Sequence, residues 1–170
     1  DTGLVTHYSD DRSEHASING RLILSLFEGA DRQLFIGSFD SGLSIMDRHS
    51  ARFGSVSVAK EEGRGLSHRG VWCFEEDREN KTLWIGTAGG GLNHFQPQTG
   101  VYTYLRHNPE DPNSLSSDYL WSLKQDRHNP DHLWVGSTIG LDRLDKSTGR
   151  VTRLNKLEPD SLGISTGMVV

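Results

Sequence analysis

The chain repeats itself about every 50 residues, and this periodicity constrains its fold more than any other feature. The tetrapeptide LFIG at Leu34–Gly37 recurs as LWIG at Leu83–Gly86 and as LWVG at Leu133–Gly136, spacings of 49 and 50 residues. A Gly-Leu pair begins within five residues of each copy. A fixed period of this length is typical of architectures in which each unit packs on its neighbours. We therefore expect a row of equivalent structural units.

Each unit contains short apolar runs separated by turn residues, which predicts strands. The third unit shows four such runs, namely YLWSLKQ, HLWVGS, GLDRLD and GRVTRL. They are rich in β-branched and aromatic residues and are bounded by Gly, Asp, Asn, Ser and Pro, as strands joined by hairpins are. Helical periodicity is not sustained over the length that a helix needs. Four antiparallel strands per unit describe a propeller blade.

The sequence thus predicts an all-β chain that forms a β-propeller segment of about three four-stranded antiparallel blades plus a partial blade, with residues 1–170 as one domain. The blades are expected at 22–58, 71–105 and 119–154, and extra strands at 4–8 and 166–170. Because the extra strands belong to incomplete units, we expect a piece of a larger propeller. Open sheet edges and uncovered apolar faces favour contact with the remaining blades or self-association of the fragment.

The first strand of each unit carries a large residue beside a small one. The large residues in register are Leu24, Trp72, Trp121 and Met168, and the small residues next to them are Ser25, Cys73 and Ser122. Large and small faces allow neighbouring sheets to interlock. The alternative is an aromatic platform that binds a sugar or a nucleic acid. Cys73, the single cysteine, has no disulfide partner in the chain and is expected to be a small buried hydrophobe.

The net charge argues against binding to nucleic acid or anionic lipid, and the lengths of the apolar runs argue against a membrane span. The formal net charge is -5, so the chain offers no basic field for nucleic acid or anionic lipid. No apolar run approaches the 18 or so residues of a membrane span. We expect no nucleic-acid partner.

The triple glycine Gly89–Gly91 raises the question of a phosphate-binding loop. A P-loop requires G-x-x-x-x-G-K-[ST] before a helix, and a dinucleotide site requires G-x-G-x-x-G between a strand and a helix. The segment GTAGGGLNHF runs from strand to strand and contains no lysine. The sequence predicts a turn between the second and third strands of a blade.

The segment LWIGTAGGGLNHFQPQTGVYTYLRHNPEDPNSLSSDYLWSL resembles the two-component regulator propeller repeat, and the resemblance extends over essentially the whole chain. The first unit departs from the pattern at HSARF, which lacks a Thr-Gly turn, and KEEGRG replaces the Asp-Pro-Asn loop. The resemblance implies a periplasmic sensor region of a bacterial inner-membrane protein whose output domain is a histidine kinase or a diguanylate cyclase. Several members of the family sense carbohydrates.

Candidate catalytic and metal-binding groups are few. His128 and His132 are four residues apart, but Asn129-Pro130 prevents the helix that would bring them together. The acidic loop at 108–118 has the composition of a calcium loop without its spacing. The paired carboxylates at Glu75–Asp77 and Asp10-Asp11 are the candidates for hydrolysis. Asp77 recurs as Asp126, which indicates Asx turns, so we expect no catalytic residue, metal or cofactor.

Ligand recognition is expected at the loops that lead into the first strand of each blade, because side chains from successive blades converge there. The predicted ligand-binding residues are Asn19, Arg21, His68, Arg69, Asp118 and Tyr119. The predicted function is non-enzymatic sensing of a small molecule or oligosaccharide by the extracytoplasmic region of a bacterial signalling protein. The alternatives are a propeller-type lyase or glycan-cleaving enzyme and a pure protein-interaction scaffold.

Overall fold

The residues that the structure describes form three four-stranded antiparallel sheets. The computed structural model describes residues 3, 5–9, 17–29, 32–50, 52–61 and 63–154. The first blade contains β1 (Ile23–Glu28), β2 (Gln33–Ser38), β3 (Leu43–Asp47) and β4 (Arg52–Val56). The second contains β5 (Val71–Asp77), β6 (Thr82–Thr87), β7 (Leu92–Gln96) and β8 (Val101–Leu105). The third contains β9 (Leu120–Gln125), β10 (His132–Ser137), β11 (Leu141–Asp145) and β12 (Val151–Arg153).

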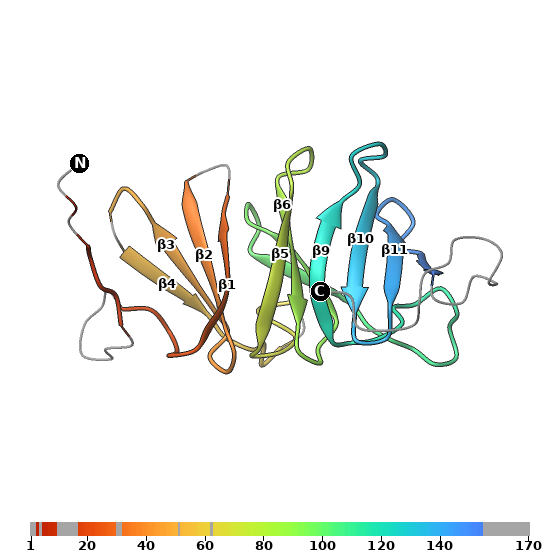
Figure 1. The fold of residues 1–170 in the computed structure, drawn as a ribbon, viewed down its shortest axis with the longest axis horizontal. Coiled ribbons are helices and arrows are strands. Elements are labelled where there is room, and N and C mark those ends of the chain that lie inside the picture. Colours follow the sequence, from red (N-terminus) through yellow and green to blue (C-terminus); the bar gives the residue numbers. More distant parts are fainter. Residues whose placement is uncertain are drawn as a thin grey trace.

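In each blade the strands follow one another as a meander, so sequence neighbours are also hydrogen-bonded neighbours. The blades stand side by side in sequence order (Figure 1), and the first strands β1, β5 and β9 lie next to one another. The described residues contain no α-helix. The predicted all-β architecture of four-stranded blades is therefore confirmed.

The structure does not show the two extra strands predicted at 4–8 and 166–170 among the residues it describes. The described residues 5–8 of the expected strand 4–8 do not form a strand, although the ring of Tyr8 packs edge-on against Phe53 of β4 with centroids 5.3 Å apart. Residue 4 and the expected strand at 166–170, with Met168, lie outside the described residues.

Two apolar cores lie between the blades. The core between the first and second blades includes Phe35, Leu43, Phe74 and Ile85, and the rings of Phe35 and Phe74 are 6.3 Å apart. The core between the second and third blades includes Trp84, Leu92, Leu123, Leu133 and Leu144. Each sheet therefore buries its apolar side chains only when a neighbouring sheet covers them.

The small residues of the first strands allow the blades to approach closely. A Cβ on Gly86 would lie 2.4 Å from the Sγ of Cys73 and 3.2 Å from the Cβ of Leu120 in the next blade. The same arrangement occurs one blade earlier, where the Ser25 hydroxyl donates to the carbonyl oxygen of Val71 at 3.1 Å. The glycine that ends the LWIG motif is thus required by close packing between sheets.

The large residues in the first strands, Leu24, Trp72 and Trp121, were expected to pack between neighbouring sheets, and they do not. Leu24, Trp72 and Trp121 are each the unpaired residue at a break in strand register, between Ile23 and Ser25, between Val71 and Cys73, and between Leu120 and Ser122. A bulge turns its extra side chain away from the regular alternation. Leu24 is consequently 40% exposed, and the two tryptophan rings are partly exposed and stack on each other at 4.0 Å.

Candidate functional site at the inter-blade loops

The inter-blade loops, defined here as residues 17–22, 66–70 and 115–119, lead into β1, β5 and β9. They contain all six residues predicted to bind a ligand. Because each first strand runs away from its inter-blade loop, the β5–β6 and β9–β10 turns lie at the other end of the sheets (Figure 1). The structure therefore has two ends to compare as candidate sites.

The triple glycine brings two inter-blade loops together. A Cβ on Gly90 would lie 2.6 Å from the Cβ of His68, and a Cβ on Gly89 would lie 3.2 Å from the ring of Tyr119. A Cβ on Gly91 would lie 3.0 Å from the Asp118 carboxylate. The turn between β6 and β7 therefore lies between His68 of one loop and Asp118 and Tyr119 of the next, and side chains on the turn would keep these loops apart. The turn predicted from sequence is confirmed, with close approach as its physical reason.

Hydrogen bonds hold the loop residues in place. The carbonyl oxygen of Asp118 accepts from the backbone N–H groups of Gly89 and Gly91, both at 3.0 Å. Its carboxylate accepts from the backbone N–H of His107 at 2.7 Å. The Nδ1 atom of His68 accepts from the backbone N–H of Gly70 at 3.1 Å, so the neutral ring carries its proton on Nε2. His68 and Asp118 are partly buried, whereas Tyr119 is 50% exposed.

Aromatic rings adjoin this cluster. Trp72 and Trp121 are the second residues of β5 and β9, close to the inter-blade loops, and their rings are inclined by 26°. The ring of Tyr119 lies 6.4 Å from that of Trp72. We define the His68 cluster as His68, Asp118 and Tyr119 together with Trp72 and Trp121. The two tryptophans were expected to pack between sheets, and no local signal in the sequence marks them as bulge residues.

The predicted residue Asn19, which precedes the first blade, forms its hydrogen bonds with that blade. The backbone N–H of Asn19 donates to the hydroxyl of Ser44 at 2.8 Å, and its side-chain amide donates to the carbonyl oxygen of Ser41 at 3.2 Å. The side chain of Asn19 therefore braces the β2–β3 turn of its own blade. Arg21 and Arg69 are exposed.

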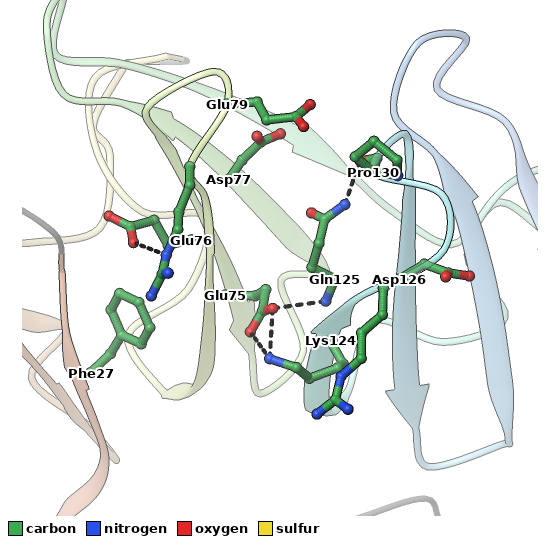
Figure 2. Close-up of a pocket in the computed structure, with 11 residues that line it drawn as sticks. Phe27, Glu75, Glu76, Asp77, Glu79, Lys124, Gln125, Asp126 and Pro130 are labelled. Atoms are coloured by element: carbon green, nitrogen blue, oxygen red, sulfur yellow. Dashed lines mark hydrogen bonds and ion pairs between the residues drawn. The ribbon is translucent and has the colours of Figure 1, made fainter.

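A cleft of about 430 Å³ lies at the opposite end, between the second and third blades (Figure 2). It is lined by the β5–β6 and β9–β10 turns and by Phe27 of the first blade. The carboxylate of Glu75 accepts from the Lys124 ammonium at 2.8 Å and from the backbone N–H of Gln125 at 2.8 Å. These contacts cross from one blade to the next, so the polar groups of the cleft serve to join the blades.

A buried ion pair lies beside the cleft. The Lys146 ammonium donates to the Asp77 carboxylate at 2.6 Å and to the side-chain oxygen of Gln125 at 3.1 Å. The side chains of Lys146 and Asp77 are 7% and 4% exposed. Burial alone would raise the pKa of Asp77, but hydrogen bonds from Lys146 and Asn80 outweigh it and hold that pKa below its ordinary value. Sequence reasoning missed Lys146, since its partner is 69 residues away.

The candidates for catalysis and metal binding have structural partners. The carboxylates of Asp77 and Asp126 accept backbone N–H groups of their own turns, from Asn80 at 3.1 Å and from His128 at 2.8 Å, which confirms the predicted Asx turns. Across the described ranges, no three His, Cys, Asp or Glu side chains form a group that could hold a metal ion. Asp10 and Asp11 lie outside the described residues.

The acidic loop at 108–118 already surrounds a cation of the protein. The guanidinium of Arg153 donates to the carbonyl oxygens of Asp111 and Leu115, both at 3.0 Å, and to that of Ser114 at 2.9 Å. It also donates to the hydroxyl of Ser114 at 2.8 Å. Carbonyl groups that could ligate calcium are thus directed at Arg153, which explains a loop with calcium-like composition and no calcium-loop spacing.

Comparison with known proteins identifies the repeat. Residues 65–89, which include the loop of His68 and the strands β5 and β6, match the family model described as two component regulator propeller. One unit of the chain is thus similar to this repeat. The resemblance predicted from the sequence is therefore confirmed at this unit. The comparison with curated proteins finds no match.

Solved structures share the fold of this propeller chain. The extracellular domain of the hybrid two-component system BT3049 of B. thetaiotaomicron is 23% identical with a TM-score of 0.76, and the match covers 87% of this chain and 20% of that one. The corresponding domain of BT4673 from the same organism is 20% identical with a TM-score of 0.62, and the match covers 79% and 17%. PorZ, a surface component of the type-IX secretion system of Porphyromonas gingivalis, is 14% identical with a TM-score of 0.60, and the match covers 85% and 22%.

These similarities confirm the predicted β-propeller segment. The chain spans about a fifth of the length of the solved structures that it matches. Within the residues described, no helix has the length and apolar character needed to cross a membrane.

Proposed function

We propose that this chain belongs to the extracytoplasmic sensor region of a bacterial signalling protein and recognises a ligand without transforming it. The propeller repeat at 65–89 carries the proposal, and the fold shared with extracellular domains of hybrid two-component systems supports it. The family setting points to the periplasmic side of an inner-membrane protein, with a histidine kinase or a diguanylate cyclase as the output domain.

The ligand we propose is an oligosaccharide bound at the His68 cluster. The apolar face of a sugar ring packs well on a flat aromatic ring such as the half-exposed ring of Tyr119. Sugar hydroxyls need both donors and acceptors, which the Nε2–H of His68 and the carboxylate of Asp118 supply on either side of the glycine turn. Arg69 and Arg21 would border this surface, while Asn19 would act through its turn.

Binding without catalysis agrees with the ion pairs that the carboxylates at the opposite end of the blades form. Glu75 and Asp77 are engaged by Lys124 and Lys146, so the triplet Glu75–Asp77 offers no free pair of carboxylates for acid and base chemistry. In the proposed mechanism, a ligand that contacts two inter-blade loops favours one rigid-body arrangement of the blades. The output domain would respond to that arrangement.

Isothermal titration with a panel of polysaccharide-derived oligosaccharides tests the proposal. We expect saturable binding by one member, weakened about tenfold or more by Tyr119→Ala, because the ring supplies the stacking surface. Val101→Ala is the matched control, since Val101 is 42% exposed on the outer strand β8 of the same blade pair. It should bind as the unchanged protein does.

Other outcomes separate the alternatives. Formation of shortened or unsaturated sugars during the incubation would overturn the sensor proposal in favour of a propeller-type lyase or glycan-cleaving enzyme. No binding across the panel, or equal binding by Tyr119→Ala and the unchanged chain, would also contradict it. Absence of binding across the whole panel would favour a protein-interaction scaffold.

A further inference from the structure

The cleft between the second and third blades lies at an interface whose two sides are both present in the structure. Its lining residues come from the ends of β5 and β9 and the turns that follow them, with Phe27 of β1 beside them. Figure 2 shows Phe27 and Glu76 on one side of the cleft and Lys124 and Gln125 on the other. The volume of about 430 Å³ falls in the range of small-molecule sites. The cleft is therefore large enough for a small ligand.

Three of the carboxylates that line the cleft are bound by donors of the protein itself. Glu75 accepts from the Lys124 ammonium at 2.8 Å, and Asp77 accepts from the Lys146 ammonium at 2.6 Å. The carboxylate of Asp126 accepts two backbone N–H groups of its own turn, at 2.8 Å and 3.2 Å. These carboxylates hold the blades and turns in place and are not available to a ligand.

The two arginines that line the cleft, Arg78 and Arg127, leave most of their donors unused. They occupy equivalent places, directly after Asp77 and Asp126. Arg127 forms no hydrogen bond or ion pair with any residue that the structure describes. The side chain of Arg78 is 84% exposed and donates only through Nε, to Glu76 at 3.3 Å, so its two terminal nitrogens have no acceptor within the described ranges. Each of the two turns thus brings an available guanidinium group to the cleft.

Glu79 is a lining carboxylate that has no partner in the described part of the chain. Figure 2 shows it beside Asp77, at the far end of the cleft from Phe27. A guanidinium group carries five N–H donors, so two of them outweigh one unpaired carboxylate. The available groups of the cleft therefore suit an anion.

The ring of Phe27 gives the cleft an apolar side. It is partly buried and lies 6.2 Å from the ring of Phe35 and 6.2 Å from that of Phe74. Because two aromatic neighbours hold this ring, it offers a fixed flat surface for an apolar group. Guanidinium groups bind carboxylates through two parallel hydrogen bonds. Together these features select a carboxylate that is attached to a flat apolar body.

We propose that this cleft binds a small organic carboxylate of that kind. The ligand's carboxylate accepts hydrogen bonds from Arg78 and Arg127, and its apolar body packs on Phe27. Such a ligand contacts the turns of two successive blades and adds to the contacts between them at this end. The site lies at the opposite end of the sheets from the inter-blade loops, so the inference does not depend on the oligosaccharide proposed there.

Fluorine NMR with para-fluorobenzoate as the probe tests the site, at low ionic strength because salt screens exposed charges. We expect saturable binding with a dissociation constant on the order of 1 mM, as for other ligands of this size. Arg78→Gln and Arg127→Gln should each raise it about fivefold or more, because each removes a charged donor. Arg52→Gln is the matched control, since Arg52 is exposed on the outer strand β4 and does not line the cleft, and it should bind normally.

Three further measurements define the ligand. The neutral para-fluorobenzamide should not saturate the site, and acetate should displace the probe at least about tenfold less effectively than benzoate, because it has no body to pack on Phe27. Glu79→Gln should bind the probe at least as tightly as the unchanged chain does, since it removes a like charge. Circular dichroism establishes that each variant is folded.

Several results would overturn the proposal. Equal binding by the Arg78 and Arg127 variants and the unchanged chain would place the probe elsewhere on the molecule, such as on the ring of Tyr119. Saturable binding of the benzamide, or displacement by acetate as effective as that by benzoate, would remove the role of the charge or of Phe27. Weaker binding by Glu79→Gln would show that the cleft prefers a cationic group, and absence of probe binding would leave the two arginines as solvated surface residues.

Discussion

Asp142 of β11 accepts hydrogen bonds from both the backbone N–H and the hydroxyl of Ser116, each at 2.8 Å. This contact joins the third strand of a blade to the inter-blade loop that precedes it. Asn93 occupies the equivalent position in the second blade, where it accepts from the backbone N–H of Ser67 at 2.8 Å and donates to the hydroxyl of Ser67 at 2.7 Å. One position on the third strand therefore anchors the loops that carry the His68 cluster.

The charge of Asp142 has a cost that Asn93 avoids. Asp142 is fully buried, and its second oxygen, Oδ1, has no hydrogen-bond partner in the described structure. Burial raises the pKa of Asp142, and the hydrogen bonds from Ser116 offset this only in part. Because the folded state holds the proton more tightly than the unfolded state, the free energy of unfolding falls as the pH rises through the raised pKa, and the loss persists at neutral pH.

Asp142→Asn should therefore stabilise the protein at pH 7. We expect a gain of about 1–2 kcal/mol in the free energy of unfolding, since the buried charge and its unpaired oxygen are removed. Urea unfolding of the variant and the unchanged protein at pH 7 and at pH 3.5 measures this gain. The gain should shrink at pH 3.5, where the carboxyl of Asp142 is increasingly protonated in both the folded and the unfolded state. The reverse change Asn93→Asp should be destabilising at pH 7. A less stable Asp142→Asn protein at pH 7 would contradict this account.

The two lysines that join the second and third blades should differ sharply in their effect on stability. Lys146→Met leaves the buried carboxylate of Asp77 without its cation, so we expect a loss of about 3–5 kcal/mol. Lys124→Met removes a lysine whose side chain is 64% exposed, and its partner Glu75, 12% exposed, keeps the backbone N–H of Gln125 as a donor, so the loss should be smaller, about 1 kcal/mol. Urea unfolding of the two variants at pH 7 makes the comparison. Equal losses would show that the Asp77–Lys146 pair is not buried in solution.

The same pair predicts acid sensitivity. The pKa of Asp77 is depressed in the folded state, so its stabilising contribution is present above the ordinary value of 3.8 and is lost as the pH falls through the depressed pKa. The difference in stability between the unchanged protein and Lys146→Met should therefore narrow below pH 3.8. A constant difference across this range would contradict the linkage.

Cys73 should be inert toward thiol reagents in the folded protein. Burial raises the pKa of its thiol to about 12, so at pH 8 only about one molecule in ten thousand carries the thiolate. We expect labelling by a chromogenic disulfide reagent to proceed at the rate of unfolding and to become fast in urea. Rapid labelling of the folded protein at pH 8 would show that the interface between the second and third blades opens.

The sequence predicts the blades well because their signals are local. Strand length, turn residues and the LWIG motif all lie within one unit, and the twelve strands of the described residues recur at the spacing of the repeat. Contacts between units could not be predicted in this way. Arg153 organises the loop at 108–118, and at the equivalent position Tyr104 donates its hydroxyl to the carbonyl oxygen of Gly65 at 2.9 Å. Two different side chains thus stabilise two different loops, and neither is recognisable without its spatial neighbours.

The candidate site was predictable to a similar extent. The repeat places His68, Asp118 and Tyr119 on inter-blade loops, but their approach depends on the β6–β7 turn passing between those loops. The positions of Trp72 and Trp121 depend on bulges that shift the alternation by one residue, and residue composition alone does not reveal a bulge. The ligand role of the predicted residues remains a prediction.

The glycine of the LWIG motif provides a direct test of blade packing. Gly86→Ala would place a Cβ 2.4 Å from the Sγ of Cys73 and 3.2 Å from the Cβ of Leu120, so we expect a loss of about 1–3 kcal/mol in the free energy of unfolding. Gly54→Ala is the matched control, because the nearest atom to a Cβ there, the carbonyl oxygen of Ile45, is 4.0 Å away. That change should alter stability by no more than about 0.5 kcal/mol. Adding Cys73→Ala to Gly86→Ala should recover part of the loss, since it removes the nearer of the two clashing atoms and leaves Leu120 in place. If Gly86→Ala were as stable as Gly54→Ala, the sheets would not approach each other at this glycine, and the motif would need another explanation.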